Sequence, residues 1–62
     1  MMYIVASDGD SPLNIYFIKN ELDIDDVLNK ANANYLDLFD DKGNPMHKTW
    51  KFNYTSQVYE AI

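Results

Sequence analysis

Apolar and polar residues alternate along most of the chain, and one segment departs from this pattern. Between Asp23 and Ala33 the apolar residues recur every three or four positions, as on one face of an amphipathic helix. This stripe consists of Ile24, Val27, Leu28 and Ala31. Asp23 is the expected N-cap, and Leu22 before it can pack against Val27. The pattern therefore predicts one helix, over residues 23–33.

Four other segments have the composition of strands. The runs Met2 to Ala6 and Leu13 to Ile18 flank a dense cluster of turn residues, so we expect them to form an antiparallel hairpin. Tyr35 to Asp40 and Thr49 to Thr55 follow the helix and alternate with period two. In the last of these runs the aromatic residues share one face: Trp50, Phe52 and Tyr54.

Turn residues mark the remaining boundaries. Asn32 or Asn34 is expected to end the helix in the left-handed conformation. Residues 40–43 have Asp first and Gly fourth, as in a type I turn, and Asn44-Pro45 after them suggests a longer loop. The segment Ser56 to Ile62 is ambiguous between a strand and one helical turn.

The element order predicts an α+β fold for a single domain spanning residues 1–62. We expect a ββαββ arrangement: a four-stranded, mostly antiparallel sheet with one helix packed on one face. The first strand could lie beside the third strand or beside the last. In outline this arrangement resembles the β-grasp and immunoglobulin-binding mini-domains. The resemblance is one of architecture alone, and it implies no function.

Composition excludes several classes of site. The chain has 62 residues, no cysteine and one histidine, so it has no disulfide and lacks the ligands of a structural zinc site. We predict no cofactor. No apolar run reaches the length of a membrane span, and the first residues lack the features of a signal peptide. We therefore expect a cytoplasmic protein.

The charge distribution is uneven. The net charge is −5, which argues against direct binding to nucleic acid or to anionic membranes. Residues 1–41 contain nine acids and two lysines, whereas residues 42–62 contain three lysines and one acid. Small size, acidity and a residue usage typical of AT-rich coding sequence favour an origin in a phage or another mobile element.

No motif indicates catalysis or metal binding. Asp8-Gly9-Asp10-Ser11 contains alternating acids, but an EF-hand loop needs a glycine and an acid where this chain has Leu13 and Lys19. His47 is the only side chain with an ordinary pKa near neutrality, and no serine near it has the setting of a nucleophile. The paired carboxylates of Asp40 and Asp41 need a desolvated pocket that so short a chain rarely forms. We therefore predict that the protein is not an enzyme.

The aromatic residues at alternate positions 50, 52 and 54 have two interpretations. They could stack on the bases of a single-stranded nucleic acid, but the negative charge opposes this, so we expect them in the core. A second apolar surface has no such explanation. If Ile4, Ile15 and Phe17 lie under the helix, the alternating residues point to the uncovered face of the sheet. These residues are Tyr3, Val5, Tyr16, Ile18, Tyr35 and Phe39.

Two functions follow as hypotheses. The first is a non-enzymatic protein-binding module that uses this face, or an open sheet edge, to bind a partner protein or its own copy. Val58, Tyr59 and Ile62 could instead fold over part of the face. The second is an acidic inhibitor whose carboxylates imitate nucleic-acid phosphates and block a nucleic-acid-binding enzyme of the host. Its surface would consist of Glu21, Asp23, Asp25, Asp26, Asp37, Asp40 and Asp41. These acids could equally serve the helix start, a turn and solubility.

Overall fold

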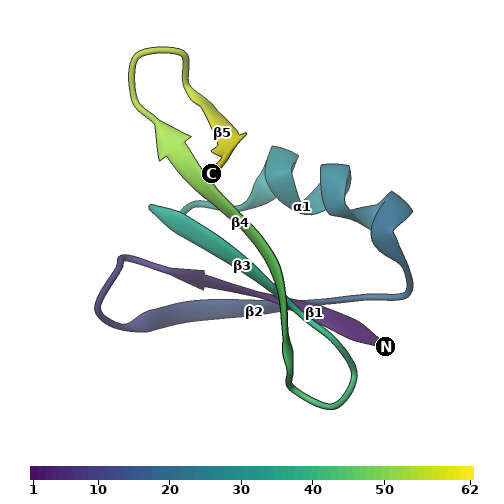
Figure 1. The fold of residues 1–62 in the computed structure, drawn as a ribbon. Coiled ribbons are helices and arrows are strands. Elements are labelled where there is room, and N and C mark those ends of the chain that lie inside the picture. Colours follow the sequence, from purple (N-terminus) through teal and green to yellow (C-terminus); the bar gives the residue numbers. More distant parts are fainter.

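Most of the chain forms one antiparallel sheet, and a short helical layer covers one face of this sheet (Figure 1). The computed structural model describes residues 1–62. Its elements are β1 (Met2–Ser7), β2 (Pro12–Ile18), the 3-10 helix η1 (Glu21–Asp23), α1 (Ile24–Lys30), β3 (Tyr35–Phe39), β4 (Pro45–Asn53) and β5 (Val58–Ala61). The α+β class is confirmed, but the prediction of four strands was wrong, because the sheet has five. Neither helical segment is long and apolar enough to cross a bilayer.

The strands lie in the order β2-β1-β3-β4-β5, with every neighbouring pair antiparallel. The first strand lies beside the third, which was one of the two predicted arrangements. The chain crosses the sheet once, through η1 and α1, while β1–β2, β3–β4 and β4–β5 are hairpins (Figure 1). The two edges of the sheet are therefore β2 and β5.

The ambiguous C-terminal segment forms the fifth strand. Asn53 ends β4, and its side-chain oxygen accepts the backbone N–H groups of Thr55 and Ser56. The N–H of Gln57, in the left-handed region at φ 61°, donates to the carbonyl of Asn53. These bonds close a tight turn that folds β5 back on β4.

The capping hydrogen bonds at the start of the helical segment differ from the prediction. The side chain of Asn20 caps η1 by accepting the N–H of Leu22 at 2.8 Å. Asp23 occupies the N-cap position of α1 but makes no side-chain capping bond there; its carboxylate accepts the N–H of Lys19 at 3.2 Å instead. Leu22 is 88% exposed, so the predicted packing against Val27 was wrong.

The helix also ends earlier than predicted. α1 finishes at Lys30, and Ala31 already has extended backbone angles. The predicted left-handed stop at Asn32 or Asn34 was wrong, because neither residue has a positive φ. Ala31, the last residue of the predicted stripe, packs against the core from the connection between α1 and β3.

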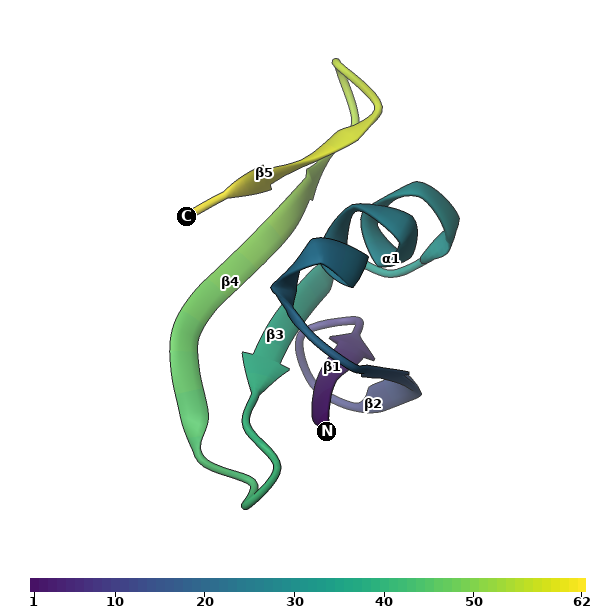
Figure 2. The ribbon, with the colours of Figure 1, turned by 90° about the vertical axis from the view of Figure 1, so that its right-hand side faces the viewer.

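β4 is longer than the predicted strand and begins at Pro45, so the expected long loop before it was wrong. The Asp40 carboxylate accepts the N–H groups of Lys42 and Asn44, and this keeps the β3–β4 turn short. His47 has a φ of 58°, and the pairing of β3 with β4 is irregular at this point. Such an irregularity bends a strand. β4 follows a curved path past the helical layer (Figure 2).

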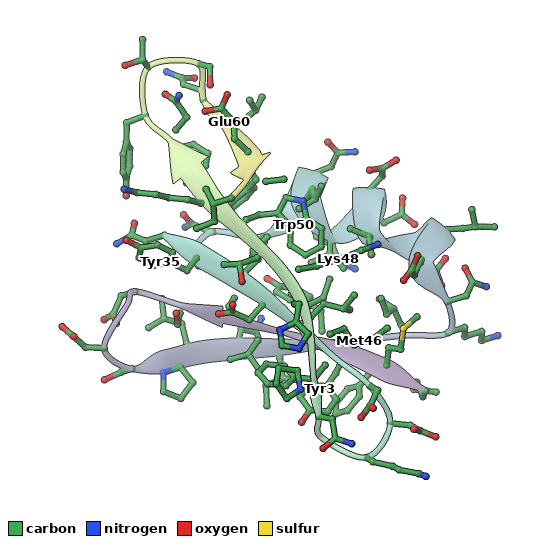
Figure 3. All side chains as sticks on the ribbon, in the orientation of Figure 1. Tyr3, Tyr35, Met46, Lys48, Trp50 and Glu60 are labelled. Carbon is green, nitrogen blue, oxygen red and sulfur yellow. The ribbon has the colours of Figure 1, made fainter.

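The core lies between the sheet and the helical layer. It consists of Ile4, Ala6, Ile18, Ile24, Val27, Leu36 and Leu38. Leu28, expected at its centre, is only half-buried at the rim. Met46, Lys48 and Trp50 extend from β4 toward the helical layer (Figure 3). Trp50 packs against the core as predicted, whereas Tyr54 is exposed beyond the end of β4.

The orientation of β2 is opposite to the prediction. Ile18 is 5% exposed and belongs to the core, and Tyr16 packs against the core with Lys30 Nζ 5.5 Å from its ring centroid. Ile15 and Phe17 consequently point to the uncovered face. Side chains alternate with period two in a strand, so a shift of one residue exchanges the two faces. β2 has apolar residues at both parities, and the pattern could not decide between them.

Candidate functional site on the uncovered sheet face

Five apolar side chains lie together on the sheet face opposite the helix. Directly opposed residues of paired strands share a face, and the register places Tyr3 between Phe17 and Phe39, and Val5 opposite Ile15. We call this surface the aromatic face. Its members are Tyr3 and Val5 of β1, Ile15 and Phe17 of β2, and Phe39 of β3.

Tyr3 is the centre of the aromatic face. Its ring stacks on Phe39 with centroids 5.3 Å apart and is tilted toward Phe17 at 6.0 Å. Gly43, at φ +84° in the β3–β4 turn, allows the Tyr3 hydroxyl to come close, since an added Cβ would lie 3.3 Å from it. The three rings therefore form one row across β2, β1 and β3.

No other part of the chain covers the β2 side of this row. Phe17 is 68% exposed and Ile15 47%. Single exposed apolar residues are ordinary on a protein surface, but a contiguous group of this kind is typical of a binding surface. The alternative that the C-terminal residues fold over the face was wrong, because β5 pairs with β4 at the far edge of the sheet.

The rest of the same sheet face is mainly polar. The Thr49 hydroxyl donates to the Asp37 carboxylate at 2.6 Å, and Lys51 Nζ lies 5.9 Å from the Tyr35 ring centroid. At the outer hairpin, the Asn53 side-chain amide donates to Glu60 at 2.6 Å. Tyr35 extends away from the helical layer at the boundary between the two regions (Figure 3). The uncovered face is thus divided into an apolar half near β2 and a polar half near β5.

Four of the six predicted face residues lie on the uncovered face: Tyr3, Val5, Tyr35 and Phe39. The placement of Tyr16 and Ile18 was wrong, because β2 turns these two side chains toward the helical layer. Sequence reasoning missed Ile15 and Phe17 as face residues and assigned both to the core. Their spacing at every second position does signal one face of a strand, but it does not say which face.

The acidic residues do not form one surface. Glu21 pairs with Lys48 at 3.4 Å in the helical layer, whereas Asp37 lies on the opposite sheet face. Asp25 and Asp26 are exposed on α1, and Asp40 and Asp41 belong to the β3–β4 turn. Asp23, as described above, bonds to the backbone.

Two carboxylates act as turn-forming acceptors. The backbone N–H groups of Ser11 and then Asp10 lower the pKa of Asp8, and the N–H of Asn44 is the main cause of the lowered pKa of Asp40. Asp8 holds the β1–β2 turn in this way. No group of three or more His, Asp or Glu side chains is placed so that it could hold a metal ion.

The remaining candidates lie apart from the aromatic face. His47 is exposed at the bend of β4 and makes no side-chain hydrogen bond. A groove runs between α1 and the β4–β5 hairpin, because the short helix does not cover the sheet as far as β5. Leu28, Phe52 and Tyr59 line it, and the Tyr59 hydroxyl is occupied by the backbone of Ala33.

Comparison with known proteins returned no relative. No protein-family model, curated protein or solved structure matches this chain. The function is therefore argued from the geometry of the chain itself.

Proposed function

We propose that this chain is a small non-enzymatic protein-binding module and that the aromatic face is its binding surface. One observation carries the proposal: the exposed side chains of Ile15 and Phe17 continue a row of stacked rings on a sheet face that nothing covers. Burying such side chains against a partner is favourable, since apolar area leaves water.

The chemistry of the aromatic face suits a protein partner. Rings supply large contact areas with few rotatable bonds, and such residues carry much of the energy of protein interfaces. The row contains no charged side chain, so contact with it leaves no unpaired charge buried. Asp37 and Lys51 border it as a polar rim.

No specific observation favours imitation of nucleic acid. The acids occupy both layers of the molecule, and four of them, Glu21, Asp23, Asp37 and Asp40, already have partners within the chain. We therefore retain the binding module as the single proposed function.

The proposal is tested by removing one exposed ring. Phe17→Ser eliminates the most exposed member of the aromatic face, and Leu22→Ser removes an even more accessible apolar side chain from η1 as a matched control. Partners are recovered from lysate of the source cells on each immobilised variant and quantified by mass spectrometry. We expect Phe17→Ser to reduce recovery about tenfold, as for a central interface residue, and Leu22→Ser to change it by no more than about twofold.

Both variants must first show the circular dichroism and melting behaviour of the parent chain. Equal recovery with the parent and with Phe17→Ser would contradict the proposal. An equal loss with both variants would also contradict it, since that would reflect non-specific binding by exposed apolar groups and not binding by this face.

A further inference from the structure

Three aromatic side chains line one cavity on the covered side of the sheet, beside the β4–β5 turn. Phe52 lies two residues after Trp50, which packs against the core, so both side chains are on the same side of β4. Tyr59 lies directly opposite Phe52 in the pairing with β5, and Tyr54 follows the end of β4. All three line a cavity of about 190 Å³. We call Phe52, Tyr54 and Tyr59 the ring cluster, and it lies on the opposite side of the sheet from the aromatic face.

The rings of the cluster stand at near right angles to one another. The ring centroid of Phe52 lies 5.0 Å from that of Tyr54, with 76° between the two planes. It lies 5.1 Å from that of Tyr59, with 70° between the planes. Rings in this arrangement can surround a compact group from more than one direction, whereas a flat stack cannot.

Both tyrosines of the ring cluster are held in place by the connection between α1 and β3. The Tyr59 hydroxyl is bonded to the N–H and the carbonyl of Ala33, each at 2.9 Å. The Tyr54 hydroxyl donates to the side-chain oxygen of Asn34. A site whose side chains are already fixed loses little conformational entropy when a ligand binds. The tyrosines therefore offer pre-positioned rings, and their hydroxyls are occupied within the chain.

The charges around the ring cluster are negative. Asp8 is one of the residues that line the cavity, and Asp25 lines the adjoining groove of about 430 Å³ between α1 and the β4–β5 hairpin. The lining of both spaces contains no lysine. The two lysines that lie over aromatic rings, Lys30 and Lys51, do so elsewhere in the chain. Together with the net charge of −5, this lining favours a cationic ligand.

We propose that the ring cluster binds a quaternary ammonium group, such as that of choline or of a trimethylated lysine. The quadrupole of an aromatic ring attracts a cation placed over its face, and several rings around one cation add their attractions. A fully methylated nitrogen has no N–H and needs no hydrogen-bond acceptor. A primary ammonium would bring three donors to walls whose hydroxyls are occupied.

The size of the cavity limits what enters it. Pockets for drug-sized ligands have about 300–1,000 Å³, so a cavity of about 190 Å³ suits a small head group and not a whole large ligand. The adjoining groove provides space for the rest of the molecule, which carries the ammonium group. This site is independent of the proposed function, because it shares no residue with the aromatic face.

NMR titration of the ¹⁵N-labelled chain with choline chloride tests the proposal, with sodium chloride adjusted to keep the ionic strength constant. The matched neutral ligand is 3,3-dimethyl-1-butanol, which has a carbon in place of the quaternary nitrogen. We expect choline to shift the amide signals of Ala33, Asn34, Phe52 and Tyr59 with a millimolar dissociation constant. The neutral alcohol should bind at least about fivefold more weakly, because it lacks the attraction between cation and ring.

Replacement of one ring tests the position of the site. Tyr54 is 71% exposed, so its replacement leaves the core intact. Tyr54→Leu removes the ring and keeps an apolar side chain, and we expect it to raise the dissociation constant for choline at least about fivefold. Tyr54→Phe keeps the ring and serves as the matched control, with an expected change of no more than about twofold.

A second pair of probes identifies the source of the ammonium group. One is a short peptide that contains trimethyllysine, and the other is the same peptide with unmodified lysine. Tighter binding of the methylated peptide than of choline assigns the site to a modified side chain, and the reverse assigns it to a small molecule; both results uphold the site. Equal binding of choline and the neutral alcohol overturns it. Equal effects of Tyr54→Leu and Tyr54→Phe, or no amide shifts with choline at about 50 mM, also overturn it.

Discussion

Single carboxylates hold several local structures of this chain by accepting backbone N–H groups. At the turns, the strength of these bonds depends on the charge of the carboxylate. Asp8 and Asp40 each accept backbone N–H groups in a hairpin turn, and these bonds lower their pKa from the ordinary value of 3.8. A group whose pKa is lower in the folded state adds stability above its unfolded pKa and loses it as the pH falls through the folded value. Both turns should therefore weaken in acid, below about pH 4.

This dependence can be isolated with neutral variants. We expect the urea midpoint of the parent chain to fall between about pH 6 and pH 2, and to fall less in the double variant Asp8→Asn, Asp40→Asn, whose side-chain oxygens still accept but do not titrate. Asp25→Asn, on the exposed side of α1, is the control. Identical slopes for the parent and the double variant would show that other acids govern the acid sensitivity.

Residue chemistry was partly predictable. The turns at residues 8–11 and 40–43 follow directly from their Asp and Gly content. The capping of the helical segment was harder, because Asn20 and Asp23 both precede it and both can accept an N–H. The 3-10 turn η1 determines which residue caps the segment. Asn20 caps this turn, and the Asp23 carboxylate accepts the N–H of Lys19.

At the scale of elements, one tyrosine joins β5 to a part of the fold other than its neighbouring strand β4. The Tyr59 hydroxyl both donates to the carbonyl of Ala33 and accepts its N–H, each at 2.9 Å, and its ring meets the edge of Phe52. Ala33 lies in the connection from α1 to β3, so this contact joins the last strand to the middle of the chain.

We expect Tyr59→Phe to destabilise the attachment by about 1–3 kcal/mol, because it leaves a partly buried N–H and carbonyl without their partner. Hydrogen exchange should show faster exchange of the β5 amides with little change in β1. Tyr54→Phe serves as a control: its hydroxyl also bonds, to Asn34, but the side chain is exposed. Uniformly faster exchange in every strand would show that β5 is not a separate unit.

The elements differ in how far their own sequence determines them. β1 and β3 were predicted almost to the residue, because turn-forming residues bound each short run of strand-forming residues. β2 was located correctly but turned over, because Tyr16 and Ile18 are as apolar as Ile15 and Phe17. The four residues of β5 are too few to reveal a period, and the turn bonds of Asn53 fold them back to pair with β4.

At the scale of the whole molecule, the asymmetry between the two sheet faces defines the candidate site. The α+β class was foreseeable from element order, and the placement of the first strand beside the third was one of the two arrangements that it allowed. The uncovered apolar face was also expected, because one helix cannot cover two faces. Its members from β1 and β3 were predicted, but those from β2 were not, since they depended on the orientation of β2, which only the packing of Ile18 beneath the helical layer fixes.

The position of β1 between β2 and β3 also determines the order in which the chain can fold. Three of the four strand pairings in the sheet are hairpins that close locally, but β1 meets β3 only after β2, η1 and α1 have intervened. Closing that long loop costs entropy before its contacts form, so it sets the rate. We expect Leu38→Ala, at this pairing, to slow folding, whereas Tyr59→Phe should mainly speed unfolding. Stopped-flow rates that reverse these two effects would contradict this order.

Until β3 arrives, the β1–β2 hairpin has one side open and its apolar residues on both faces in water, so a nascent chain is most vulnerable to aggregation at that stage.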